Sequence, residues 1–308
     1  MGEMLLIGVR FGLYLALTAL FGLAAFAIYG LQDQERKMAF PLRLWLLAGA
    51  ALGLIFSAAW LPLEASLMAD LPLWPIDPGA VEALVADPSI GTAWLLRVAM
   101  LTLALLGATR AGRSGIWLGV VAISSGAALS SLAWAGHGAV DEGAVGWAHL
   151  GADIFHLIAA GVWVGALLVL LLLSYRRAVR VDAAHLKLMH RVLHQFGAVG
   201  IGVVATLIIT GLINSLMLVG IGNVTTIGTS RYGQLLLGKL AVFLTMLVIA
   251  SLNRFWLTPA FEQSIANGNT THSLMMLRTS LAVEAACIIL ILALVALLGI
   301  ETPPGSIS

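Results

Sequence analysis

Charged residues are scarce in this 308-residue chain, in which Asp, Glu, Lys and Arg make up 10% and hydrophobic residues 60%. The mean hydropathy is +1.01. A water-soluble domain of this length needs a polar shell that such a composition cannot supply. The composition therefore excludes a soluble domain and predicts an integral membrane protein. With a net charge of only +1, nothing in the sequence indicates binding to nucleic acid.

Cysteine is nearly absent. Cys287, the only one, lies in an apolar run, which excludes a disulfide framework and a cysteine-based zinc site. No Walker A sequence is present, so we do not expect coupling to ATP, and no catalytic motif indicates an enzyme. The N-terminus lacks a Lys/Arg-rich region followed by a small-residue cleavage site. We therefore expect the first apolar segment to be a retained helix.

Long apolar runs, by contrast, are abundant. A membrane-spanning helix needs about 20 mostly apolar residues. Eight segments meet this rule: 4–30, 42–63, 92–110, 115–135, 148–174, 194–220, 233–257 and 275–300. We predict an all-α integral membrane protein in which residues 1–308 form a single polytopic domain. The connection at about 64–91 is rich in proline and acidic residues, and we expect it to form an ordered cap or a short interfacial helix.

Basic residues are distributed unevenly among the connections. Twelve of the sixteen follow the first, third, fifth and seventh segments: Arg36, Lys37, Arg43, Arg110, Arg113, Arg176, Arg177, Arg180, Lys187, Arg191, Arg254 and Arg278. The opposite connections are acidic, and Arg231 is their only basic residue. Cytoplasmic loops carry the excess of Lys and Arg. We therefore predict that both termini lie outside the cytoplasm.

The chain also shows a weak internal repeat. In the third and seventh segments a Gly at the helix start precedes a basic residue by six positions: Gly91 and Arg97 in one, Gly233 and Lys239 in the other. The first and fifth segments share a weaker match between Gly22 and Gly165. An even number of helices returns each repeat to the same side. We infer two four-helix halves in parallel orientation, 1–135 and 136–308.

Three ionisable side chains share one face of the fifth predicted helix. His149, Asp153 and His156 fall at i, i+4 and i+7, and His156 lies roughly 10 Å deeper than His149 at 1.5 Å per residue. The preceding loop carries His137 to the same surface. Ionisable groups inside a membrane are costly, so such a stripe indicates a functional site. We predict a metal site in which imidazoles hold copper, as Cu(I) or Cu(II).

Each of these residues also has a structural interpretation. The two helix histidines would then be an interfacial side chain and a hydrogen-bonded histidine of the bundle. Asp153 is either a hydrogen-bond acceptor that orients a ligand imidazole or the partner of Arg97 or Lys239 in an ion pair. The sequence leaves these alternatives open.

Two further candidate ligands lie near the outer end of the sixth predicted helix. Met217 carries a thioether, a soft ligand suited to Cu(I), and follows Asn214 by three residues. Asn214 is polar at membrane depth and either binds the metal or bridges helices. Met217, with Met100 behind it, is otherwise a gap-filling core side chain.

Lys239 and Glu284 are ionisable groups deeper in the last two predicted helices. The long lysine stem could neutralise Glu284 in a structural pair. Alternatively, both belong to a path for a proton or a cation, to which Asp153 and Arg97 also contribute.

Several motifs resemble the copper resistance protein D (CopD) family of bacterial inner-membrane proteins. They are Gly211-x-x-Asn214-Ser215, Tyr232-Gly233-x-Leu-Leu-x-x-Lys239, Asn253-Arg254 with Pro259, and His156-Leu-x-Ala-Ala-Gly-Val-Trp163-Val-Gly165. The resemblance covers roughly 135–300. It implies copper handling at the bacterial inner (cytoplasmic) membrane, by movement from periplasm to cytoplasm, with both termini periplasmic. The implied partners are the copper ion, the lipid bilayer and a periplasmic CopC-like carrier.

Three functions compete at this point. A copper-binding permease would capture the ion at the His cluster and pass it inward. A b-type membrane cytochrome would need two facing histidines or a single axial one, but His149 and His156 share one helix and cannot flank one iron. A non-transporting copper receptor or delivery scaffold would use the outer site without an inner path. A homo-oligomer is compatible with all three.

Overall fold

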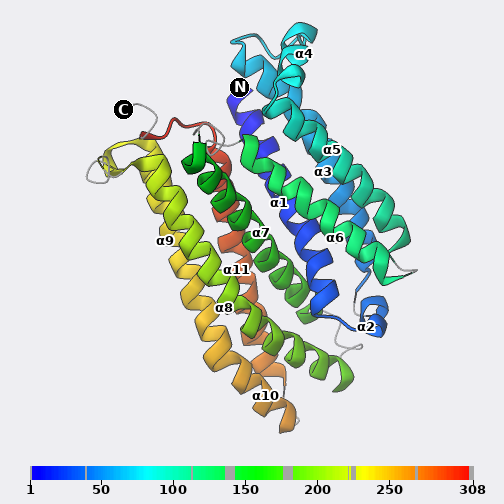
Figure 1. The fold of residues 1–308 in the computed structure, drawn as a ribbon. Helices are drawn as coiled ribbons and strands as arrows, with labels where there is room; N and C mark the ends of the chain where they lie inside the picture. The colour runs from blue at the N-terminus through cyan, green and yellow to red at the C-terminus, as the bar shows by residue number, and fades with distance from the viewer. Residues whose placement is uncertain are drawn as a thin grey trace.

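The computed structural model describes residues 2–38, 40–111, 114–135, 143–175, 183–220, 222, 227–267 and 270–304 (Figure 1). Within these ranges the chain is helical and has no strand. Eight helices are long and apolar enough to cross a membrane, which confirms the predicted fold class. Their successive elements are α1 (Gly2–Tyr29), α2 (Asp33–Met38), α3 (Leu42–Met68), α4 (Pro78–Ala86), α5 (Ile90–Arg110), α6 (Gly115–Ser130), η1 (Ser131–Ala135), α7 (Gly143–Ser174), α8 (Ala183–Val219), α9 (Arg231–Leu252), η5 (Asn253–Leu257), α10 (Thr258–Ala266) and α11 (Thr271–Leu298).

Several helices extend beyond the predicted spans. α3 continues past Pro62 to Met68, and α8 begins eleven residues before the expected start at 194. A π-helical turn, η5, joins α9 to α10, so that one spanning segment runs over Arg231–Ala266. Hydropathy marks the part of a helix that lies in hydrocarbon, whereas the helix itself continues into the interface. The acidic connection contains the short helix α4, as predicted.

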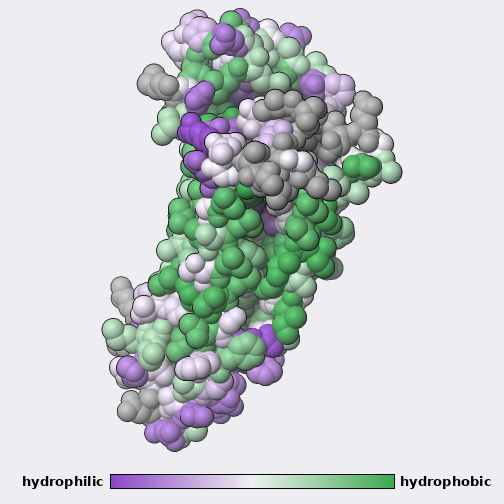
Figure 2. All heavy atoms as spheres, turned by 90° about the vertical axis from the view of Figure 1, so that its left-hand side faces the viewer, coloured by the Kyte–Doolittle hydropathy of each residue, from purple (hydrophilic) through white to green (hydrophobic). Residues whose placement is uncertain are grey.

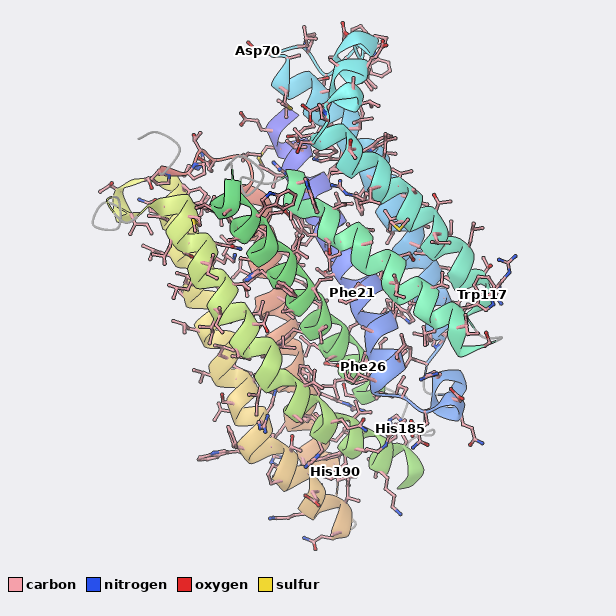
Figure 3. All side chains as sticks on the ribbon, in the orientation of Figure 1. Phe21, Phe26, Asp70, Trp117, His185 and His190 are labelled. Atoms are coloured by element: carbon pink, nitrogen blue, oxygen red, sulfur yellow. The ribbon has the colours of Figure 1, made fainter. Side chains whose placement is uncertain are left out.

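The two ends of the bundle differ in chemistry. Both termini and α4 lie at one end, and α2 and α10 lie at the other (Figure 1). Figure 3 places Asp70 at the first end and His185 and His190 at the second. Between the ends, a broad hydrophobic belt covers the face formed by α8 and α9 (Figure 2). This arrangement suits a bilayer, with the acidic connections on one side and the basic ones on the other.

The helices of the two predicted halves can be matched as α1 with α7, α3 with α8, α5 with α9, and α6 with α11. In the first half α1 packs against α3 and α6, and α5 packs against α3 and α6. In the second half α7 packs against α8 and α11, and α9 against α11. The pair that corresponds to α3 and α5 is α8 and α9. Over the described residues these two helices make at most marginal contact. The second half is therefore open between these two helices.

The two halves meet at a close crossing of α1 and α7. A Cβ atom on Gly22 would lie 2.1 Å from the carbonyl oxygen of Gly161, and one on Gly165 would lie 2.0 Å from the carbonyl carbon of Gly22. Only glycine allows the backbones to approach this closely. Equivalent residues of two repeats meet only near the axis that relates them. Gly22 and Gly165, which are matched in the predicted repeat, meet at this crossing. The repeat itself stays a prediction.

We expect Gly165→Ala to destabilise the protein, because the added methyl group would overlap the backbone of α1. Overpacking in a close-packed interior costs about 1–3 kcal/mol or more. Gly151→Ala on the same helix is the matched control, since a Cβ there meets nothing within 4 Å. Thermal unfolding in detergent measures the effect. Equal midpoints for the two variants would contradict a backbone crossing at Gly165.

Candidate functional site

The predicted stripe lies on α7 near the end of the bundle that holds the termini. His149 is buried, with 1% of its surface exposed, and Asp153 and His156 are partly buried. His137 lies outside the described residues. The α7 stripe faces α8, against which α7 packs. The two helices exchange polar contacts at two levels.

At the deeper level, the His156 ring is oriented by Thr210 of α8. Its Nδ1 lies 2.9 Å from the Thr210 hydroxyl oxygen, and that hydroxyl lies 2.6 Å from the carbonyl oxygen of Thr206. The single hydroxyl proton is donated to the carbonyl, so Thr210 accepts from the Nδ1–H of His156. The ring also packs over Gly211, where a Cβ would lie 3.5 Å from its Cε1. The Nε2 lone pair is consequently the one available for a metal.

At the outer level, Asp153 pairs with Asn214. The Asn214 side-chain nitrogen donates to a carboxylate oxygen of Asp153 at 2.5 Å. The amide oxygen of Asn214 is buried and finds no hydrogen-bond partner in the part of the chain that the structure describes. A buried acceptor without a donor is costly. This oxygen is therefore a natural ligand for a cation next to the carboxylate.

Neither Lys239 nor Arg97 lies within 4 Å of the Asp153 carboxylate over the described residues, so the alternative of a direct ion pair does not hold in this structure. The hydrogen bond from Asn214 takes its place.

Arg97 belongs to a different group of side chains, in the first half. Its Nε donates to the hydroxyl of Ser131 at 3.0 Å, and its guanidinium lies 5.4 Å from the centre of the Trp60 ring. Met217 is 38% exposed, so its sulfur is not enclosed by the site. Met100 packs against the hydrophobic core. Neither methionine is held next to the histidines in this structure.

Glu284 on α11 is buried, with 3% of its surface exposed, and accepts a hydrogen bond from the side-chain nitrogen of Asn253 in η5. The structural pair of Glu284 with Lys239 that the sequence suggested is not formed. Asn253 satisfies the carboxyl group with a neutral amide instead. Two carboxyl groups of the second half, Asp153 and Glu284, therefore share the same kind of partner.

In the part of the chain that the structure describes, no three His, Cys, Asp or Glu side chains are grouped closely enough to hold a metal ion among themselves. The candidate donor groups in the α7–α8 contact are mixed. They are the imidazole nitrogen of His156 and, nearer the outer end, the carboxyl and amide oxygens of Asp153 and Asn214. Imidazole suits copper and zinc, whereas oxygen ligands suit harder cations.

Two residues of the site were not singled out from the sequence as functional. Thr210 precedes Asn214 by one helical turn, so a polar stripe on an apolar helix was the available signal. Asn253 was noted only as part of the motif Asn253-Arg254 with Pro259, and no function was predicted for it. Its contact with Glu284 spans 31 residues of sequence, and periodicity within one helix carries no information about such a contact.

We expect the neutral His156 ring to be protonated at Nδ1. Thr210→Val removes the acceptor and should shift the ring to a mixture of tautomers, which nitrogen NMR of labelled histidine resolves. Thr206→Val is the matched control one turn earlier, because its hydroxyl bonds only to Gly202 of its own helix, at 2.9 Å. An Nε2–H tautomer in the unaltered protein would contradict the assignment.

Comparison with known proteins gives the family. Residues 1–147 match the family described as "Copper resistance protein D-like, N-terminal domain", and residues 190–298 match "Copper resistance protein D". The chain is 38% identical over 312 residues to "Copper resistance protein D" of Pseudomonas syringae pv. tomato, which covers 98% of each protein.

Two other relatives are more distant. "Copper transport protein CutJ" of Bacillus subtilis (strain 168) is 27% identical over 78% of this chain and 44% of its own length. "Inner membrane protein YebZ" of Escherichia coli (strain K12) is 27% identical over 83% of this chain and 86% of its own length. No solved structure matches the chain significantly. With its eight membrane-spanning helices and near full-length likeness to such a relative, the chain belongs to the copper resistance protein D family of copper-related multi-pass membrane proteins.

Proposed function

We propose that this protein captures copper at the periplasmic face of the inner membrane and passes it toward the cytoplasm. The orientation of His156 carries the proposal. Its Nδ1–H is held by Thr210, so its Nε2 lone pair points away from α8's hydroxyl and is ready for a metal. A histidine that binds a metal typically donates its other ring N–H to an acceptor in this way.

The other proposed ligands lie between His156 and the outer end of the bundle. His149 lies two turns toward the outer end, and the loop residue His137 would close the site from outside. The free amide oxygen of Asn214 completes the set beside Asp153. Met217 would join only by turning inward from its exposed position. Imidazole binds both oxidation states of copper, and a thioether would favour Cu(I).

Charge explains why the ion would enter. The Asn214 amide is neutral, so its hydrogen bond brings no positive charge to the Asp153 carboxyl group. Among the described residues, no lysine or arginine forms a salt bridge with Asp153. A cation that bound there would meet a carboxyl oxygen without a competing lysine or arginine in contact. The membrane potential, worth about 2.3 kcal/mol per charge per 100 mV, would then drive inward movement.

A periplasmic CopC-like carrier is the donor that fits this proposal. The outer connections are acidic and include α4, whose first turn is capped by Asp77 through a 2.8 Å hydrogen bond to the Ala80 backbone. This ordered acidic cap, at the same end of the bundle as the site, offers a surface for a copper-loaded partner.

We expect purified protein to hold copper near stoichiometry and His156→Ala to lose it. Metal analysis with an optical spectrum measures this. His272→Ala is the matched control, because His272 is exposed and lies at the start of α11, at the other end of the bundle. A Soret band in the unaltered protein would show bound haem and favour the membrane cytochrome instead. No copper after loading would mean that the histidines are structural.

A second variant separates a permease from a scaffold. Glu284→Gln should keep copper binding but lower uptake into vesicles by about tenfold, which corresponds to about 1.4 kcal/mol in the barrier. Glu262→Gln is the control, since this carboxylate is exposed on α10 and faces His190 at 3.5 Å. Unchanged uptake in Glu284→Gln would favour the non-transporting receptor.

A further inference from the structure

A cavity of about 520 Å³ lies in the second half, on the side of the bundle away from the termini. It is lined by α7, α8, α9, η5, α10 and α11, is open on one side, and lies where α8 and α9 diverge. Asn253 and Glu284 are among the polar side chains of its wall, and His194 and Arg254 also line it. The rest of its wall is largely apolar.

The cavity wall carries polar and charged side chains beside its apolar ones. Asn253 and Glu284 line it together with His194 and Arg254. Glu284 is 3% exposed and accepts a hydrogen bond from the Asn253 amide. The indole nitrogen of Trp163 and the amide oxygen of Asn253 are buried behind this wall, without a hydrogen-bond partner among the described residues. A buried carboxyl group thus shares the wall of one cavity with an amide, an imidazole and a guanidinium.

An acyl chain could fill the apolar wall but could not hydrogen-bond to the polar side chains that line the cavity, since hydrocarbon neither donates nor accepts a hydrogen bond. Water can do both. At about 30 Å³ per molecule, the cavity holds on the order of ten or more waters. The π-helical turn η5 supports the same interpretation, because such turns are frequent at functional sites. This turn places Asn253 against Glu284.

We propose that this cavity is a water-filled vestibule through which Glu284 exchanges protons with the cytoplasm. Non-helical backbone and ionisable groups at membrane depth occur where they line water-filled space. The carboxyl group would gain and lose its proton along the water, with the Asn253 amide as its fixed partner in the bundle. The proposal rests on the membrane orientation and the inward copper path of the proposed function. It adds the cytoplasmic end of that path.

The charged groups around Glu284 are few. His194 of α8 and Arg254 of η5 line the same cavity. Arg278 precedes Glu284 on α11 and donates to the backbone oxygen of Ser174 at 2.6 Å. The α7 segment that faces the cavity presents Trp163 and no ionisable group. On α1, which also packs against α11, Arg10 bonds to Gly299 at the opposite end of the bundle.

Cysteine labelling tests the vestibule directly, because Cys287→Ser leaves the chain without a thiol. In that background, Ala198→Cys on α8 and Ala250→Cys on α9 place a thiol at the cavity wall. Ile208→Cys and Leu240→Cys are matched controls on the same two helices, at exposed positions outside the cavity. Gln263→Cys on α10 reports the aqueous surface at that end.

A membrane-impermeant thiol reagent is applied to sealed vesicles of each orientation. We expect Ala198→Cys and Ala250→Cys to react from the same side as Gln263→Cys, at least about tenfold faster than the two controls, because a thiol in hydrocarbon stays protonated and unreactive. If only Gln263→Cys reacts, the cavity is filled by lipid and the proposal fails.

Infrared spectroscopy tests the proton exchange. The protonated carboxyl band that is absent from Glu284→Gln should shift when the medium is changed to deuterium oxide and should change in intensity with pH. If the cavity cysteines react with the thiol reagent but the carboxyl band responds neither to deuterium oxide nor to pH, the proposed role of Glu284 is wrong. Neither experiment uses copper, so loss of the outer copper site leaves this proposal standing, and a dry cavity leaves the copper site standing.

Discussion

The contact between α1 and α7 at Gly22 and Gly165 is the constraint on which the rest of the bundle depends. Two backbones that touch fix the separation and the crossing of the two central helices. In a membrane there is no hydrophobic driving force between helices, so such packing has to hold them together. Once the crossing is set, α7 presents its ionisable stripe to α8 on the far side from α1. The position of the candidate copper site thus follows from two glycines that lie elsewhere on the helix.

A second regularity concerns how the ionisable groups are satisfied. At the ends of the bundle, charged residues pair with opposite charges, as in Arg191 with Glu35 and Arg231 with Glu301. Inside the second half, the partners are neutral: Thr210 for His156, Asn214 for Asp153 and Asn253 for Glu284. A neutral partner fixes the geometry of an ionisable group without supplying the opposite charge. Groups held in this way remain able to bind a cation or a proton, whereas a salt bridge would already have neutralised them.

Sequence reasoning was sufficient for the spans because hydropathy reports directly on what lies in hydrocarbon. It was also sufficient to place His149, Asp153 and His156 on one face, since that follows from helical periodicity alone. It failed for partners on other helices. The sequence offered Lys239 for Glu284, but the carboxyl group bonds to Asn253, which η5 places there by inserting a π-helical turn. Helix-to-helix contacts depend on the rotation and tilt of each helix, and hydropathy determines neither. His137 lies outside the described residues, so its role as a ligand at the outer side of the site stays a prediction.

The difference between the halves shows where the function is to be sought. If both halves descend from one repeat, the packed α3–α5 pair and the open α8–α9 pair began alike. The first half kept a closed interior, in which Arg97 is held by Ser131 and Trp60. In the second half, Asp153, Asn214 and His156 lie in the α7–α8 contact near one end, and a cavity lies beside Glu284 toward the other. Separating α8 from α9 forfeits their packing, and Glu284, His194 and Arg254 are ionisable groups on the wall of the cavity that results. The proposed path for an ion would give this loss of packing a function.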